Sequence, residues 1–130
     1  MQTYKMTRKN GKCLAKVSHK HTKADNLPDA FTKLDNGFDI FTHSPDGVEW
    51  GYSGSGPAQL ALAILYHCFG KMYVQKVKDH YMQFKCDIVA IHKENVWTIN
   101  TFDIFAWLIT CTNEKDPEFL QDLILRNKHS

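Results

Sequence analysis

The chain has 130 residues, of which 43% are hydrophobic and 23% are charged. This length is typical of one domain with its own core, so we expect a single domain over residues 1–130. The ordinary composition excludes a disordered or low-complexity chain. The net charge of +2 gives no general argument for binding nucleic acid or an anionic membrane.

The cysteines and the apolar segments indicate the compartment. Cys13, Cys68, Cys86 and Cys111 lie far apart, so the chain has no C-x-x-C pair of the kind found in zinc sites and redox motifs. The first residues contain no apolar segment typical of a signal peptide. No apolar run reaches the ~18 residues of a membrane span. We therefore expect a cytoplasmic protein with reduced thiols.

A β-hairpin is expected at the start of the chain. Residues 3–18 contain two β-rich segments around Asn10-Gly11, which favours a two-residue hairpin turn because both residues accept positive φ. Residues 19–36 are polar and indicate a long connection, with a helical turn over residues 27–34.

A second hairpin is expected over residues 37–52. Its turn is the sequence SPDG at residues 44–47, where proline fixes φ at the second position of a type I turn and glycine closes it. On the second strand, Trp50 and Tyr52 are two residues apart, which predicts that both rings share one face.

Two helices are expected next. Pro57 suits the first turn of a helix, where its missing N–H costs nothing, and Gly70 suits the position just after a helix end. The segment between them is apolar on almost all sides, which is typical of a buried helix. A second, amphipathic helix is expected over residues 72–84.

The last third of the chain predicts a third hairpin, over residues 86–99, and two more helices. Asn100 or Thr101 should cap the first helix, and Asp116 with Pro117 should begin the second. The order ββββααββαα, with hairpin-linked strands, indicates an α+β fold with an antiparallel sheet. On the first of these two helices, the side chains expected to face the core are those of Phe102, Phe105, Ala106, Leu108 and Ile109.

Basic residues concentrate in the first 23 residues, which contain no acid. Such a segment can attract phosphate groups, but basic residues on an edge strand also discourage aggregation. We favour the second interpretation because the segment lacks the interleaved aromatic residues of a stacking surface. The basic residues are Lys5, Arg8, Lys9, Lys12, Lys16, Lys20 and Lys23.

The histidines and carboxylates suggest no active site. His19 and His21 share a strand face by their spacing, but no third metal ligand is evident. His67 fits a hydrogen-bonded core residue, and Glu49 fits an ordinary strand carboxylate rather than a paired acid or base. No histidine has the partners of a catalytic triad. We expect no catalytic residue, no metal ion and no cofactor.

The stretch EWGYSGSGPAQLALAIL at residues 49–65 is the most distinctive in the chain. A glycine-rich turn before a helix presents free N–H groups and the positive end of the helix dipole, which favours an anion. The order of residues fits neither the P-loop, nor the dinucleotide-binding motif, nor the nucleophile elbow, and Pro57 removes one donor. A sharp backbone turn explains the glycines as well, and we give this explanation the greater weight.

Aromatic rings, backbone N–H groups and one amide are the ligand contacts that this stretch offers. Trp50 and Tyr52 would stack on a planar group, although aromatic residues at this spacing are more often core. Gln59 would reach the ligand or, as we favour, satisfy the loop backbone. The candidate ligand-binding residues are Trp50, Tyr52, Ser53, Gly54, Ser55, Gly56 and Gln59.

The sequence VEWGYSGSGPAQLALAIL resembles the signature of a family of small bacterial and phage proteins of unknown function, approximately W-G-Y-G-G-S-G-P-A-Q-L-A-L-A-I-L. The resemblance continues through FKCDIVAIHKENVWTI to IFAWL and covers most of residues 38–108. It implies a bacterial, prophage or mobile-element origin and a small cytosolic protein, but no particular function. Ser53 replaces a glycine of the signature, which argues for a small residue there and against a nucleophile.

Three functions follow from these observations. The first is a non-enzymatic protein that binds a small anionic or nucleotide-like ligand at the glycine-rich loop and helix start. The second is a protein interaction module that acts on a host protein through an exposed surface such as the basic first hairpin, and a large apolar patch or a symmetric dimer would favour it. An enzyme that uses Glu49 or a histidine has the least support. We expect neither a membrane nor a nucleic-acid partner, and the oligomeric state stays open, a dimer included.

Overall fold

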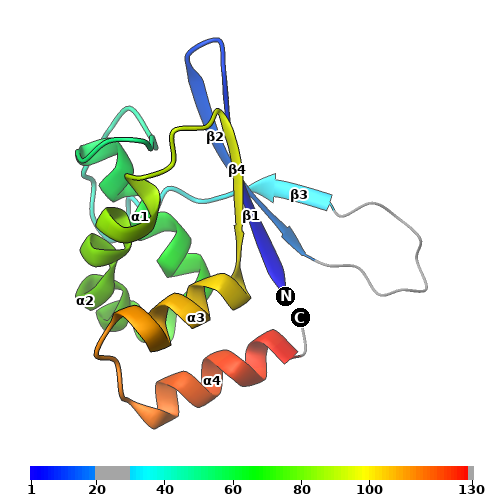
Figure 1. Ribbon diagram of the computed structural model, residues 1–130, viewed down its shortest axis with the longest axis vertical. Helices are drawn as coiled ribbons and strands as arrows, with labels where there is room; N and C mark the ends of the chain where they lie inside the picture. The colour runs from blue at the N-terminus through cyan, green and yellow to red at the C-terminus, as the bar shows by residue number, and fades with distance from the viewer. Residues whose placement is uncertain (20–29, 129–130) are drawn as a thin grey trace.

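The computed structural model describes residues 1–19 and 30–128. These residues form a four-stranded antiparallel sheet and four α-helices, so the expected α+β class is confirmed. The helices gather on one side of the sheet (Figure 1). None of the described helices is both long and apolar enough to cross a membrane.

The first hairpin is confirmed and forms the centre of the sheet. β1 (Gln2–Lys9) and β2 (Lys12–His19) are joined by Asn10 and Gly11, which both have positive φ. This backbone conformation is the one that the Asn-Gly pair favours. Alternate residues of the sheet face the helices and are buried in the core, namely Tyr4, Met6, Ala15, Val17, Trp97 and Ile99.

The two remaining strands form the edges of the sheet, in the order β3-β2-β1-β4. β3 (Ala30–Lys33) pairs with β2, so the helical turn expected over residues 27–34 is wrong for residues 30–33. The start of that turn, residues 27–29, lies outside the described residues. β4 (Val96–Asn100) pairs with β1, far from it in sequence, and not with a neighbouring strand.

The second expected hairpin is wrong, because residues 37–52 contain no strand. Its turn does form, and the Gly47 N–H donates to the Ser44 carbonyl at 3.1 Å. The chain before the turn lies against the first turns of the next helix. There the Gln59 side chain bonds the backbone at Asn36, Phe41 and His43. These bonds replace those that a partner strand would make in a hairpin.

The buried helix is confirmed as α1 (Ser55–Phe69). It begins two residues before Pro57, and Gly70 follows its end with a positive φ, as expected. A short 3-10 helix, η1 (Lys71–Tyr73), leads into α2 (Val74–Phe84), which confirms the second helix and packs against α1.

The strand expected over residues 86–92 is wrong, because α2 runs on into a π-helix. This segment is η2 (Lys85–Val89), and the Ala90 N–H donates at 2.8 Å to the carbonyl five residues before it. Trp107 donates its Nε1–H to the Asp87 carboxylate at 2.9 Å. This contact from a later helix favours the helical path over the strand that the β-branched run predicted.

The last two helices and their caps are confirmed. They are α3 (Thr101–Cys111) and α4 (Pro117–Lys128). Asn100 and Asp103 form a capping box at the start of α3. The Asp116 carboxylate accepts hydrogen bonds from backbone N–H groups in the first turn of α4.

The face of α3 that meets the core is only partly the expected one. Ile104, Trp107 and Leu108 are buried, and the partly buried Phe105 packs against the core. Leu108 and Phe105 belong to the expected set, whereas Ala106, also expected there, is exposed. Phe102 and Ile109 are exposed instead. Apolar residues lie on both sides of this helix, so periodicity could not identify the buried side.

Candidate functional site

The glycines of the distinctive stretch are explained by close packing. Gly51 has a φ of +87°, and a Cβ there would lie 2.8 Å from the His92 carbonyl oxygen. A Cβ at Gly54 would lie 2.7 Å from the Tyr52 ring, and one at Gly56 would lie 2.6 Å from the Glu49 Cβ. The loop therefore needs small residues in order to fold tightly onto the start of α1.

Trp50 and Tyr52 do not share a face, because the strand that would align them does not form. Trp50 is buried, and its Nε1–H donates to the Glu94 carbonyl at 2.8 Å. The Arg8 guanidinium lies 4.4 Å from the centre of the Trp50 ring. Tyr52 is 49% exposed and covers the glycines that follow it. Tyr52 alone of the two presents a ring to solvent.

Gln59 has the role that we favoured, since its amide satisfies the loop backbone. Its side chain is fully buried. The amide oxygen accepts from the His43 and Ser44 N–H groups at 2.7 and 3.3 Å. The amide nitrogen donates to the Asn36 and Phe41 carbonyls at 2.5 and 3.1 Å. These four bonds use the whole hydrogen-bonding capacity of the amide.

A cleft of about 550 Å³ lies between this loop and the first hairpin. Of the candidate ligand-binding residues, Tyr52, Ser55 and Gly56 line it, together with Lys12 from the hairpin. Ser53 and Gly54 lie beside it, in the same turn. The expected ligand contacts thus divide into a group at the cleft and a buried pair, Trp50 and Gln59, whose partners are within the protein.

Glu49, at the edge of the cleft, is held as an ion pair. Arg8 donates to its carboxylate, and the Trp50 N–H donates to it at 3.0 Å. Burial raises the pKa of the Glu49 carboxyl, but hydrogen bonds from Arg8, Cys13 and Trp50 outweigh burial and lower it. An ionised, paired carboxylate is a poor proton donor near neutral pH.

Three lysines lie side by side on the outer face of the sheet, the face away from the helices. Lys5 faces Lys16 across β1 and β2, and Lys16 faces Lys33 across β2 and β3. Neighbouring strands are about 4.8 Å apart, and like charges directly opposite one another destabilise a sheet. On β4, the residue that faces Lys5 is Thr98, so no acidic side chain in line with the three lysines balances their charge. We call these three residues the lysine row.

Apolar side chains flank the lysine row on both sides. Leu14 and Val96 are exposed, and both face Thr7 across neighbouring strands. On the other side, Phe31 is partly exposed, and the Lys5 ammonium lies 5.6 Å from the centre of its ring. The outer face thus combines positive charge with apolar surface. Sequence reasoning noted Lys5 and Lys16 but missed Lys33, because the pairing of β3 with β2 was not expected.

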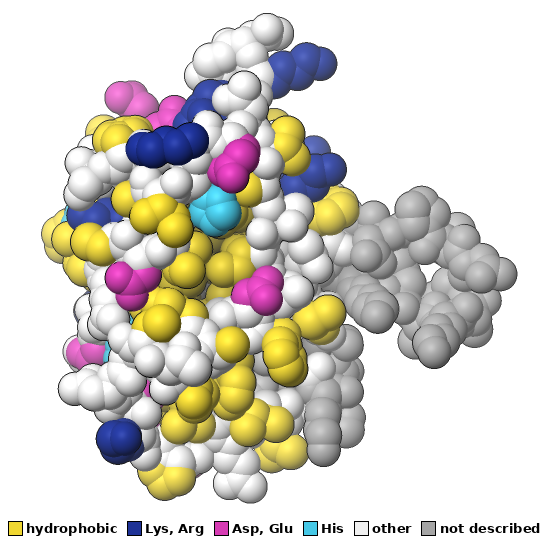
Figure 2. Space-filling model, viewed as in Figure 1, with side chains coloured by type: hydrophobic (Ala, Val, Ile, Leu, Met, Phe, Trp, Pro, Cys, Tyr) yellow, Lys and Arg dark blue, Asp and Glu magenta, His cyan; other side chains and the backbone are white. Residues whose placement is uncertain are grey.

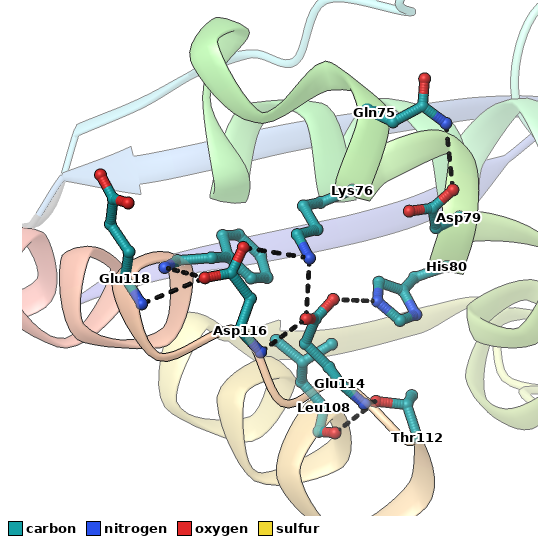
Figure 3. A network of polar contacts seen from close by, with 10 residues as sticks. Gln75, Lys76, Asp79, His80, Leu108, Thr112, Glu114, Asp116 and Glu118 are labelled. Atoms are coloured by element: carbon teal, nitrogen blue, oxygen red, sulfur yellow. Dashed lines mark hydrogen bonds and ion pairs between the residues drawn. The ribbon is translucent and has the colours of Figure 1, made fainter.

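A buried polar network, also missed by sequence reasoning, joins α2 to the turn between α3 and α4 (Figure 3). The Glu114 carboxylate accepts from Lys76 Nζ at 2.8 Å and lies 2.6 Å from His80 Nε2. Its side chain is only 6% exposed, and the Asp116 N–H donates to it at 3.1 Å. The spacing of Lys76 and His80 on one helix face was its only sequence signal.

Burial and hydrogen bonding shift the pKa of the Glu114 carboxyl in opposite directions. Burial raises the pKa of its carboxyl, but hydrogen bonds from Lys76, His80 and the Asp116 N–H outweigh burial and bring the pKa to about 2. The carboxylate therefore stays ionised and holds α2 against the turn between α3 and α4. Because His80 is buried as well, the group acts within the protein rather than on a bound molecule.

The remaining titratable groups are dispersed. All four cysteines are free thiols. In residues 1–19 and 30–128, no three His, Cys, Asp or Glu side chains lie close enough to hold a metal ion. His21 lies outside the described residues, so the pairing of His19 with His21 stays a prediction. The Tyr4 hydroxyl lies 2.9 Å from His67 Nδ1, which gives that histidine a partner within the fold.

Comparison with known proteins gives one match. No curated protein and no solved structure matches the chain. A model of a family of unknown function, DUF6166, matches residues 14–110, which extend from β2 almost to the end of α3. The match includes the glycine-rich loop and α1, the segments that carried the resemblance in the sequence. Since it covers well over half of the 130 residues, the chain belongs to the family of unknown function DUF6166.

Proposed function

We propose that this protein is a non-enzymatic interaction module that binds an acidic surface of another protein. The observation that carries the proposal is the lysine row, in which Lys5, Lys16 and Lys33 oppose one another on a sheet face. Such a row destabilises the isolated sheet, and an anionic partner would relieve the repulsion. We further propose a cytosolic location and a bacterial, prophage or mobile-element origin, with a host protein as the partner. The four free thiols are compatible with that location.

The surface around the lysine row favours a protein over a nucleic acid. Single-stranded nucleic acids bind to platforms of several aromatic rings, whereas the strands described on this face offer one such ring, that of Phe31. Leu14 and Val96 instead offer aliphatic surface beside the charges. A partner segment with carboxylates on one side and apolar side chains on the other would match this pattern.

Charge reversal within the row tests the proposal. We expect Lys16→Glu to weaken binding to the partner purified with the wild-type protein by at least about tenfold. The substitution places a negative charge in the middle of the lysine row, where it would repel an acidic partner. Isothermal titration calorimetry with the purified partner would measure the change. Lys78→Glu is the matched control, since Lys78 is an exposed lysine on α2, outside the sheet. Equal effects of the two variants, or a partner that is a nucleic acid, would contradict the proposal.

A second candidate function is the binding of a small anionic or nucleotide-like ligand in the cleft of about 550 Å³. The half-exposed Tyr52 ring favours it, because the ring lies in a cleft that Lys12 and the start of α1 also line. Asp46 and Glu49 line the cleft as well, and Glu49 is paired with Arg8. Backbone N–H groups at Ser55 and Gly56 and the helix dipole would attract an anion. Trp50 and Gln59 would support the loop from below rather than contact the ligand.

A thermal-shift assay with a panel of nucleotides separates the two candidates. If the cleft binds one of them, the ligand stabilises the wild-type protein by about 2–3 kcal/mol at a hundredfold excess over its Kd. Tyr52→Ala should abolish that shift, and Phe41→Ala, at an exposed aromatic residue outside the cleft, should preserve it. No shift with any nucleotide would exclude this second function.

A further inference from the structure

α3 is apolar on two opposite sides, of which only one is buried. Ile104, Trp107 and Leu108 face the core. On the other side, Phe102 is 70% exposed and Ile109 is 47% exposed. A helix that is apolar all round is typical of one buried on all sides. The exposed side of α3 therefore indicates a surface that another molecule covers.

The exposed side of α3 borders an apolar groove. A cavity of about 380 Å³ lies between α3 and α4, and Phe102, Phe105 and Ile124 line it. Ile124 is 44% exposed, and among the described residues no charged side chain lines the groove. Figure 2 shows apolar side chains gathered over α3 and α4 in the lower half of the view. We call Phe102, Phe105, Ile109 and Ile124 the apolar face.

The size of the apolar face suits the centre of a homodimer interface. A stable dimer buries about 800 Å² on each partner, of which roughly 65% is apolar. The exposed parts of the apolar face and of Met1 beside it amount to apolar area on the order of 400 Å². This is most of the apolar area that such a dimer needs, and Met1, Phe102, Phe105 and Ile124 line the same groove.

We propose that a second copy of this chain covers the apolar face, in a two-fold symmetric dimer that packs α3 and α4 of one subunit against those of the other. In such a dimer, equivalent surfaces meet each other. The four side chains of the apolar face are uncharged, so their self-association brings no like side-chain charges together, whereas that of the lysine row would do so. The two surfaces therefore suit different partners, and the dimer is independent of the proposed acidic partner.

Sedimentation velocity of the purified protein between about 1 and 100 µM tests this inference, because micromolar dimers dissociate within that range. We expect the wild-type protein to reach twice its 15.0 kDa mass. Phe102→Asp and Ile124→Asp should stay monomeric, because each would place two charges together in an apolar interface. Both side chains are exposed in the single chain, so circular dichroism and urea unfolding of the isolated subunit should show that the variants fold.

Met72→Asp is the matched control, since Met72 is 83% exposed on η1, away from the apolar face. This variant should dimerise as the wild-type protein does. A wild-type protein that remains monomeric at the highest concentration would overturn the inference. The same is true of a dimer that Phe102→Asp leaves intact, or of open-ended oligomers without a stable dimer. The Lys16→Glu variant should still dimerise. Failure of the dimer proposal can therefore be distinguished from failure of the proposed binding of an acidic partner.

Discussion

Replacing Gln59 with methionine is expected to lower the free energy of unfolding by about 3 kcal/mol, because two N–H groups and two carbonyls would lose their partner. The amide is fully buried and bonds the backbone at Asn36, Phe41, His43 and Ser44. Methionine has a similar volume and leaves no cavity, so the loss of stability would come from the missing hydrogen bonds of the amide. The segment from 36 to 44 should then separate from α1 while the sheet remains folded.

Urea unfolding gives the loss of stability, and hydrogen exchange gives its location. Amide exchange should become faster in residues 36–44 of Gln59→Met than in β1 and β2. Gln75→Met is the control, because Gln75 is exposed on α2 and bonds only the neighbouring Asp79 among the contacts described. We expect it to change stability by less than about 0.5 kcal/mol. Uniform exchange throughout the protein, or a loss similar to that of the control, would show that Gln59 does not hold this segment.

Acid is expected to remove about 3 kcal/mol of stability through Glu114 alone. The folded pKa of this carboxyl is about 2, below its ordinary value of 4.5. A carboxyl with a lowered folded pKa stabilises the protein fully above its ordinary pKa. The contribution is therefore complete above pH 4.5 and is lost as the pH falls from 4.5 toward 2.

Glu114→Gln should remove this contribution at neutral pH, since Lys76 and His80 would lose their carboxylate. We expect the difference in unfolding free energy between wild type and variant to be about 3 kcal/mol at pH 7 and to vanish near pH 2. Urea titrations at several pH values measure it. Glu118→Gln, at an exposed carboxylate on α4, should follow the wild-type profile. A difference that does not depend on pH would contradict the assignment of the acid loss to Glu114.

Local signals predicted those parts of the fold that depend on local chemistry. The Asn10-Gly11 turn, Gly70 after α1, the Asn100 cap and the Asp116-Pro117 start each depend on residues next to one another. Three expected strands did not form, two in the second hairpin and one in the third, because their segments depend on distant residues instead. Gln59 bonds the backbone of the segment from 36 to 44, and Trp107 bonds Asp87 within the π-helix η2. Neither contact has a signature in the sequence.

The candidate surfaces were only partly accessible from the sequence for the same reason. The glycine-rich loop was found at once, because it is contiguous, and its glycines proved to serve close packing. The lysine row required the pairing of β3 with β2, which brings Lys33 beside Lys16. The apolar face required knowing which side of α3 is buried, and both sides are apolar in the sequence. A pattern along the chain describes a single helix or strand, whereas each of these two surfaces combines residues from two or more elements.

Site-specific photo-crosslinking in living cells most directly tests whether the outer face of the sheet is the functional surface. A photoreactive phenylalanine analogue placed at Val96, which is exposed beside the lysine row, should yield one discrete adduct with another protein whose surface at the crosslink is acidic. The same analogue at Lys78 on α2 should yield none. At Tyr52, beside the cleft, it should also yield none. Adducts from Tyr52 but not from Val96 would contradict the account and favour the glycine-rich loop.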